Sequence, residues 1–167
     1  HLSIRRQRQM CIRDRYIIAA WMLEEPSDEY YYRRAIEIAD HRSFPHAAYG
    51  SYLLKHGRPE QALRRFKNAV FIDPNHIFAQ TGRIVALNSL NPADAEKEAR
   101  ELTAKWPSNS TFWFDLSRAL RTQQKYEQEL PVLRKAIELP HPKHIDHLYQ
   151  RHMADSLANN EYYIEAE

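Results

Sequence analysis

Several features that are common in soluble enzymes are scarce in this chain of 167 residues. It has three glycines, about 2% against roughly 7% in average proteins, which excludes glycine-rich phosphate loops such as GxGxxG and disfavours a sheet of tight hairpins. The longest apolar run, residues 16–23, is far shorter than the roughly 20 residues that cross a bilayer, so no membrane span is predicted. The single cysteine, Cys11, leaves the redox compartment open.

Residues 1–15 differ in composition from the rest of the chain. They hold five arginines and one aspartate without a helical pattern, and the string RRQRQMCIRDR resembles translated sequencing-adapter read-through. We therefore expect a non-native or disordered arm. Without it the chain has 19 basic and 21 acidic residues, and the net charge changes from +2 to −2. The electrostatic case for a nucleic-acid partner is lost with the arm, and no such partner is predicted.

The prolines reveal an internal repeat of 33 residues. Two interleaved series share this spacing: Pro26, Pro59 and Pro92, then Pro74, Pro107 and Pro140. Proline is tolerated in the first turn of a helix and in linkers, but not in helix interiors. The two series therefore mark alternating helix boundaries, and each repeat is predicted to hold two helices.

Hydrophobic spacing gives the same answer independently. Between Pro59 and Pro74, apolar residues recur at i, i+3, i+4 and i+7, as on one buried helical stripe, and charged residues occupy the opposite face. Another helix precedes this one, and Gly57 supplies the stop between the two. The repeating unit is predicted to be helix, tight turn, helix.

The pattern recurs with variation along the chain. Further helices are predicted over residues 16–23, 27–39, 78–90, 92–106, 112–120, 126–139 and from 145, with another helix beginning near Tyr163. Pro131 falls inside one of them, where its missing N–H and its ring are unfavourable. We expect a kink at this position, or a helix that starts late.

The pattern resembles the tetratricopeptide repeat family, whose repeat combines small and aromatic positions with a terminal proline. The matching positions are Gly50, Ala62, Phe66, Ala69 and Pro74 in one repeat, and Trp113, Leu116, Ser117, Leu120, Tyr126 and Ala136 in another. The sequence departs from the pattern at His46, Ile84 and Glu129, the last of which stands where alanine is usual.

The resemblance implies an all-α, right-handed α-solenoid of four to five antiparallel helix pairs. After the arm at residues 1–15, the predicted organisation is a degenerate pair at 16–42 and repeats at 43–76, 77–109, 110–142 and 143–167, the last truncated.

Catalytic and metal-binding patterns are not found. HExxH, GxSxG and CxxC do not occur, and the carboxylates alternate with lysines and arginines as on solvated helix faces. Four histidines lie within twelve residues, at His141, His144, His147 and His152, but no cysteine joins them and the segment reads as an exposed linker. We predict no catalytic residue, no metal and no cofactor, and leave open whether these histidines bind anything.

In the family that the chain resembles, the first helix of each pair lines the concave face, where an extended peptide or a partner helix binds. Helical geometry then gives the residues that face away from the internal stripe. The predicted binding residues are Ala47, Ser51, Leu54, Lys55, Phe78, Thr81, Val85, Asn88, Phe114, Arg118, Arg121, Arg151 and Asp155.

The exposed arginines of this set suggest two interpretations. Arg118, Arg121 and Arg151 beside Phe114 could grip a carboxylate or phosphate, or they could merely keep the face soluble. Family members that bind C-terminal carboxylates carry a lysine and asparagine pair, which Ala47 and Ser51 do not match, so a clamp for chaperone tails is disfavoured.

The resulting functional hypothesis is a protein-interaction scaffold, part of a longer and bacterial chain, with a protein or peptide partner. Two alternatives stay open. The helices form a substrate-presenting arm of a glycosyltransferase or sulfotransferase, or they belong to an envelope export or secretion component. The sequence does not distinguish a cytoplasmic from a periplasmic location, and it leaves the oligomeric state unknown.

Overall fold

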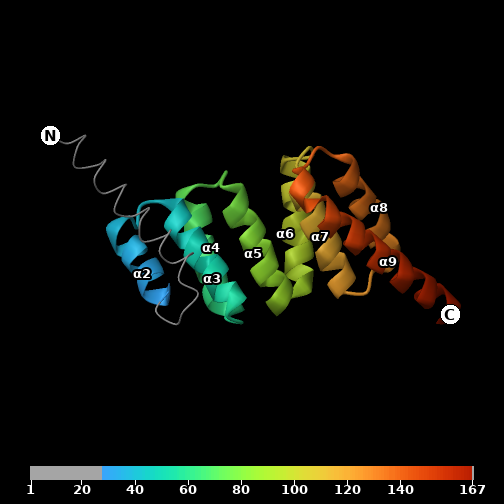
Figure 1. The fold of residues 1–167 in the computed structure, drawn as a ribbon, viewed down its shortest axis with the longest axis horizontal. Helices are drawn as coiled ribbons and strands as arrows, with labels where there is room; N and C mark the ends of the chain where they lie inside the picture. The colour runs from blue at the N-terminus through green and yellow to red at the C-terminus, as the bar shows by residue number, and fades with distance from the viewer. Residues whose placement is uncertain (1–27, 167) are drawn as a thin grey trace. The chain divides into compact units, whose positions relative to one another are not determined.

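The computed structural model describes residues 28–166, and every regular element in that range is helical. Figure 1 shows the elements in chain order. They are α2 (Asp28–Ile38), α3 (Ser43–Lys55), α4 (Pro59–Ile72), α5 (Ile77–Leu90), α6 (Pro92–Lys105), α7 (Ser110–Thr122), α8 (Tyr126–Glu138), the 3₁₀ turn η1 (Lys143–Ile145) and α9 (Asp146–Ala166). The arm at 1–15 and the helix predicted at 16–23 lie outside the described residues.

Most predicted helix boundaries are confirmed because specific residues impose them. Proline is the first residue of both α4 and α6, where its missing N–H costs nothing. Gly57, with a φ of +67°, ends α3 in the left-handed conformation that glycine adopts without strain. Its N–H donates to the Leu54 carbonyl over 3.0 Å, and the next amide donates to the Leu53 carbonyl over 2.9 Å.

Two local predictions near the C-terminal end are corrected. α8 begins at Tyr126 and continues through Pro131, so the late start is wrong. α9 is a single helix of 21 residues, so no separate helix begins near Tyr163. Its buried residues include Tyr149 and Ser156, whereas Leu148 and Leu157 are exposed.

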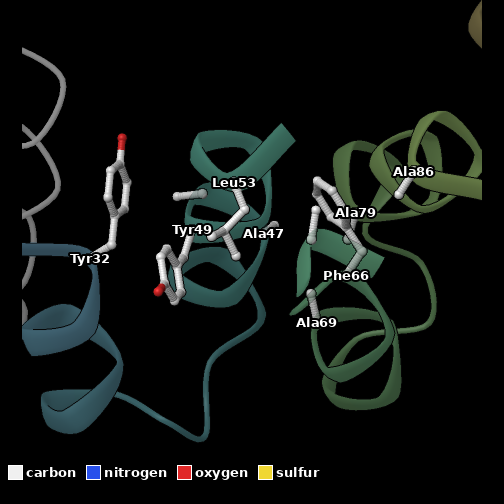
Figure 2. Packing of buried hydrophobic residues seen from close by; sticks show 10 residues of the cluster. Tyr32, Ala47, Tyr49, Leu53, Phe66, Ala69, Ala79 and Ala86 are labelled. Atoms are coloured by element: carbon white, nitrogen blue, oxygen red, sulfur yellow. The ribbon is translucent and has the colours of Figure 1, made fainter. Parts of the chain in front are cut away.

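The chain divides into two compact units, with the division between Ala86 and Leu87, inside α5. In the first unit, buried side chains of α2 to α5 form one apolar cluster, which includes Tyr32, Tyr49, Leu53 and Phe66 (Figure 2). Phe66 lies between two glycines, because a methyl group on Gly50 would come within 2.9 Å of its ring and one on Gly82 would overlap it. Close approach of α3 and α5 to α4 therefore depends on two residues that have no side chain.

A partly buried ion pair attaches α2 to the start of α4. The carboxylate of Glu29 accepts from Arg58 Nη1 over 2.8 Å, from Tyr49 Oη over 2.5 Å and from Arg33 Nη2 over 2.7 Å. The hydrogen bond from Arg58, followed by those from Tyr49 and Arg33, lowers the pKa of Glu29 to about 2. The ionised carboxylate therefore links α2 to α3 and to the start of α4.

The hydrogen bonds of Glu29 predict a specific pH dependence of stability. Because the folded pKa is lowered, the stabilisation from Glu29 is complete above its unfolded pKa of about 4.5 and disappears as the pH falls through about 2. The Tm of wild type should therefore be higher than that of Glu29→Gln at pH 6, and this difference should shrink towards pH 2. Glu37→Gln, on the exposed side of the same helix, is the control with little effect. A wild-type advantage that stayed constant down to pH 2 would contradict this assignment.

The second unit holds the rest of α5 with α6 to α9. Its apolar core includes Phe112, Leu116, Leu120 and Leu133, all buried. At the turn between α7 and α8, Lys125 Nζ donates to Glu96 Oε2 of α6 over 2.7 Å. Gln123 donates to the same oxygen over 2.8 Å, so this carboxylate holds α6 against the turn.

Candidate functional site

An exposed aromatic row marks the first unit. The rings of Phe44, at the start of α3, and Phe78, at the start of α5, each lie beside the imidazole of His76, with centroid separations of 6.4 and 6.3 Å. Phe44 is 42% exposed and Phe78 is 44% exposed. His76 Nδ1 is within hydrogen-bonding distance of Ser43 Oγ, which links the loop before α5 to the start of α3. We call Phe44, His76 and Phe78 the aromatic row.

A surface cleft of about 480 Å³ adjoins the aromatic row. Its lining residues come from the segment before α3, the first turn of α3 and the end of α4 with its following loop: His41, Arg42, Ser43, Phe44, Ile72, Asp73 and His76. It combines apolar surface from Phe44 and Ile72 with the donors of Arg42 and the imidazoles. Such a mixture suits an apolar side chain flanked by polar peptide groups.

The predicted binding residues of the first unit have different environments. Ser51 and Lys55 are exposed on α3, while Leu54 on α3 and Thr81 and Val85 on α5 are half-buried. Ala47 is fully buried in the apolar cluster, so its placement on a binding face is wrong. Because α2 and α4 both pack on α3, this helix buries more than the single stripe that its pattern suggested.

In the second unit, two of the predicted residues are engaged with other helices. Phe114 stacks on Tyr149 of α9 with ring centroids 4.5 Å apart, and it meets the His152 ring edge-on at 5.0 Å. Asn88 Nδ2 donates to Thr122 Oγ1 over 3.0 Å and so links α5 to α7. Both side chains therefore position helices.

Arg121 is also engaged within the fold, so its prediction as an exposed arginine is wrong. Its side chain is 21% exposed, and its Nε donates to Glu129 Oε1 of α8 over 2.9 Å. Its Nη2 donates to the carbonyl of His152 over 2.5 Å and also bonds Ser156 Oγ, both on α9. Asp155, which is exposed, lies 3.8 Å from Nη1. Arg121 thus joins three helices.

Glu129 is the centre of this cluster and is 0% exposed. His152 Nε2 lies 3.2 Å from its Oε1, and Ser156 Oγ donates to the same oxygen. Burial raises the pKa of Glu129, but the hydrogen bonds from His152 and Ser156 and the charge of Arg121 outweigh burial and lower it below its usual value. A residue that departs from the repeat pattern is therefore an ionised carboxylate that clasps α9. We call Arg121, Glu129, His152 and Ser156 the α9 clasp.

Arg118 and Arg151 are the predicted binding arginines of the second unit that stay accessible. Both side chains reach solvent, and Arg118 Nη1 lies 3.9 Å from the buried carboxylate of Asp115. No ion pair joins Arg151 to another residue within the described range. These two arginines keep their predicted role as candidates.

Two of the four histidines, His141 and His152, make contacts within the fold. His141 Nε2 lies 2.7 Å from Asp146 Oδ1, and its ring packs on Tyr149. His152 belongs to the α9 clasp. Among the side chains that the structure describes, no group of three or more histidine, cysteine or acidic residues is arranged to hold a metal ion. Within residues 28–166, no helix is long and apolar enough to span a membrane.

Comparison with known proteins agrees with the helix-pair architecture. The family model described as tetratricopeptide repeat matches residues 84–141. The chain resembles the solved structure of MamA residues 41 to the end from Desulfovibrio magneticus RS-1, with a TM-score of 0.69 and 16% identity, over 94% of this chain and 92% of that one.

Two further solved structures share the fold. The first tetratricopeptide domain of human RPAP3 has a TM-score of 0.59 and 21% identity, over 73% of this chain and 97% of that one. YrrB, described as a tetratricopeptide protein with an unusual peptide-binding site, has a TM-score of 0.60 and 19% identity, over 74% and 64%. No curated protein sequence matches the chain. The match over residues 84–141 and these solved structures agree on an all-α solenoid fold of the tetratricopeptide type.

Sequence reasoning found Phe78 but missed its partners in the aromatic row. Phe44 is the second residue of α3, and His76 lies in the loop before α5. The missed signal was an apolar residue, Phe44, that does not fit the buried stripe of its own helix. An aromatic residue outside the stripe is a candidate for a contact surface.

Proposed function

We propose that this chain is a protein-interaction scaffold that binds an extended peptide or a partner helix, with the aromatic row as its anchor point in the first unit. The observation that carries the proposal is the pair of exposed phenylalanines, Phe44 and Phe78, bridged by His76 beside an open cleft. Large exposed rings next to a cleft are the kind of group that supplies most of the energy of an interface.

The surroundings of the aromatic row support a peptide ligand in particular. Arg42 and His41 at the cleft offer donors to peptide carbonyls or to an acidic side chain, and Asp73 offers an acceptor. Ser51 and Lys55 extend the exposed polar surface along α3. Arg118 and Arg151 supply cations in the second unit and are proposed as additional contacts there.

Selection from a phage-displayed library of random dodecapeptides tests the proposal. The chain should select peptides that share a large apolar residue, and Phe44→Ala with Phe78→Ala should weaken their binding at least tenfold, because both exposed rings of the aromatic row are lost. Phe71→Ala removes a ring that is 88% exposed on α4 and lies outside the aromatic row, so its affinity should match wild type. Selected peptides that bind the double variant and wild type equally would refute the anchor.

The same peptides test the second unit. Arg118→Glu with Arg151→Glu should weaken acidic peptides, whereas Arg134→Glu with Lys135→Glu, both exposed on α8, should not. Unchanged binding by the first pair would remove Arg118 and Arg151 from the site.

A further inference from the structure

A second surface lies on α4 and shares no residue with the aromatic row or its cleft. Gln61, Arg64, Arg65 and Asn68 line a shallow cleft of about 270 Å³ there. Their spacing of i, i+3, i+4 and i+7 places them on one stripe, separate from the buried stripe of Ala62, Phe66 and Ala69. The four residues span about 10 Å along the helix, or two turns. We call them the basic stripe.

The cations of the basic stripe are preorganised and only partly neutralised. The Arg65 guanidinium lies 4.9 Å from the centroid of the buried Tyr49 ring, a stacking that fixes its position while its in-plane donors stay usable. Arg58 Nη2 donates to Gln61 Oε1 over 2.6 Å, which orients that amide. Arg64 is exposed and makes no ion pair with any described residue.

The surrounding segment has a strong excess of positive charge. Residues 41–86 contain seven lysines and arginines and two acidic residues. The carboxylate of Glu29, from α2, is bound by Arg33 and Arg58, not by Arg64 or Arg65. The basic stripe therefore keeps unneutralised charge.

Solubility does not require arginines at these positions. Shifting by the repeat of 33 residues maps the basic stripe onto Asp94, Lys97, Glu98 and Glu101 of α6. The same kind of outer position on the next second helix thus carries three carboxylates and one lysine. Since solvated faces of either sign serve the repeat, the arginines of α4 call for a different explanation, namely a ligand of opposite charge.

We propose that the basic stripe docks an acidic α-helical segment of a partner protein. A partner helix with carboxylates at i, i+3 or i+4, and i+7 repeats the spacing of the stripe, so two carboxylates face Arg64 and Arg65 while the amides of Gln61 and Asn68 donate at the ends. Nucleic-acid binding typically neutralises several phosphates over a longer track, and the two arginines of the basic stripe, which spans two turns of α4, form too short a track. This surface is independent of the aromatic row.

Fluorescence anisotropy with a labelled 18-residue synthetic helix tests the proposal. The probe carries glutamates at the stated spacing, and a control peptide carries glutamines at the same positions. The chain should bind the glutamate probe at least tenfold more tightly at low salt, and added salt should weaken that binding. Arg64→Glu with Arg65→Glu should remove the preference, and Arg64→Glu alone should weaken it at least threefold. Lys97→Glu, at the matching position of α6, is the control and should leave it unchanged.

The remaining arms separate the alternatives. Equal binding of the two peptides, or an equal loss with Lys97→Glu, overturns the proposal. Tighter binding of a labelled 12-nucleotide single-stranded RNA that depends on the same arginines overturns it in favour of a nucleic acid. Self-association in sedimentation that Arg64→Glu abolishes would assign the surface to a second copy. If circular dichroism shows that the Arg64→Glu, Arg65→Glu variant is unfolded, the result with Arg64→Glu alone decides the test. The Phe44→Ala, Phe78→Ala variant should bind the probe as wild type does, because the two surfaces are independent.

Discussion

Arg121→Ala is expected to lower the free energy of unfolding by about 3–5 kcal/mol, because it leaves the buried carboxylate of Glu129 without its cation. The effect should begin at α9, since Arg121 also bonds the His152 carbonyl and Ser156 Oγ on that helix. Denaturant unfolding followed by circular dichroism measures the total loss, and amide hydrogen exchange should show α9 losing protection first.

A double-mutant cycle identifies the source of that loss. Glu129→Ala restores the residue that the repeat pattern favours, and with Arg121→Ala it removes both charges, so the double variant should be more stable than Arg121→Ala alone. Arg134→Ala removes an exposed cation from α8 and should change stability by less than about 0.5 kcal/mol. Equal losses from Arg121→Ala and Arg134→Ala would mean that the α9 clasp contributes nothing.

Phe66→Ala is expected to lower the free energy of unfolding by about 3–5 kcal/mol, because it empties the space between Gly50 and Gly82 in the core of the first unit. Phe71→Ala on the same helix removes an exposed ring and should cost little. Chemical denaturation of the two variants against wild type gives the comparison.

Gly82→Ala probes the same packing from the other side. Alanine is the better helix former, but its methyl group would overlap the Phe66 ring, so a loss of about 1–3 kcal/mol is expected. In the Phe66→Ala background the ring is absent, and the same substitution should be neutral or stabilising. A stabilising Gly82→Ala in the wild-type background would show that the ring does not fill the gap.

The helices could be predicted from the sequence because local signals define them. Pro59 and Pro92 open helices, Gly57 closes one, and the apolar stripe on α4 faces the core as its spacing requires. These signals act within a few residues, so one sequence is sufficient to read them. The predicted all-α solenoid of helix pairs was confirmed for the same reason.

The binding residues were harder to predict because they depend on packing between distant segments. Ala47 is buried by helices on two sides of α3, which a single-helix pattern does not reveal. The pairing of Arg121 with Ser156 joins residues 35 positions apart, so an arginine on a polar face looked free although it is not. Most of the predicted surface, including Ser51, Lys55, Phe78, Arg118 and Arg151, stays a prediction that binding experiments decide.

Amide hydrogen exchange with and without a library-selected peptide tests the central claim most directly. If the first helices of the repeat form the recognition surface, the peptide should slow exchange in the first turns of α3 and α5, around Phe44 and Phe78, and this protection should vanish in the Phe44→Ala, Phe78→Ala variant. Protection confined to other helices, or unaffected by the loss of both rings, would contradict the account.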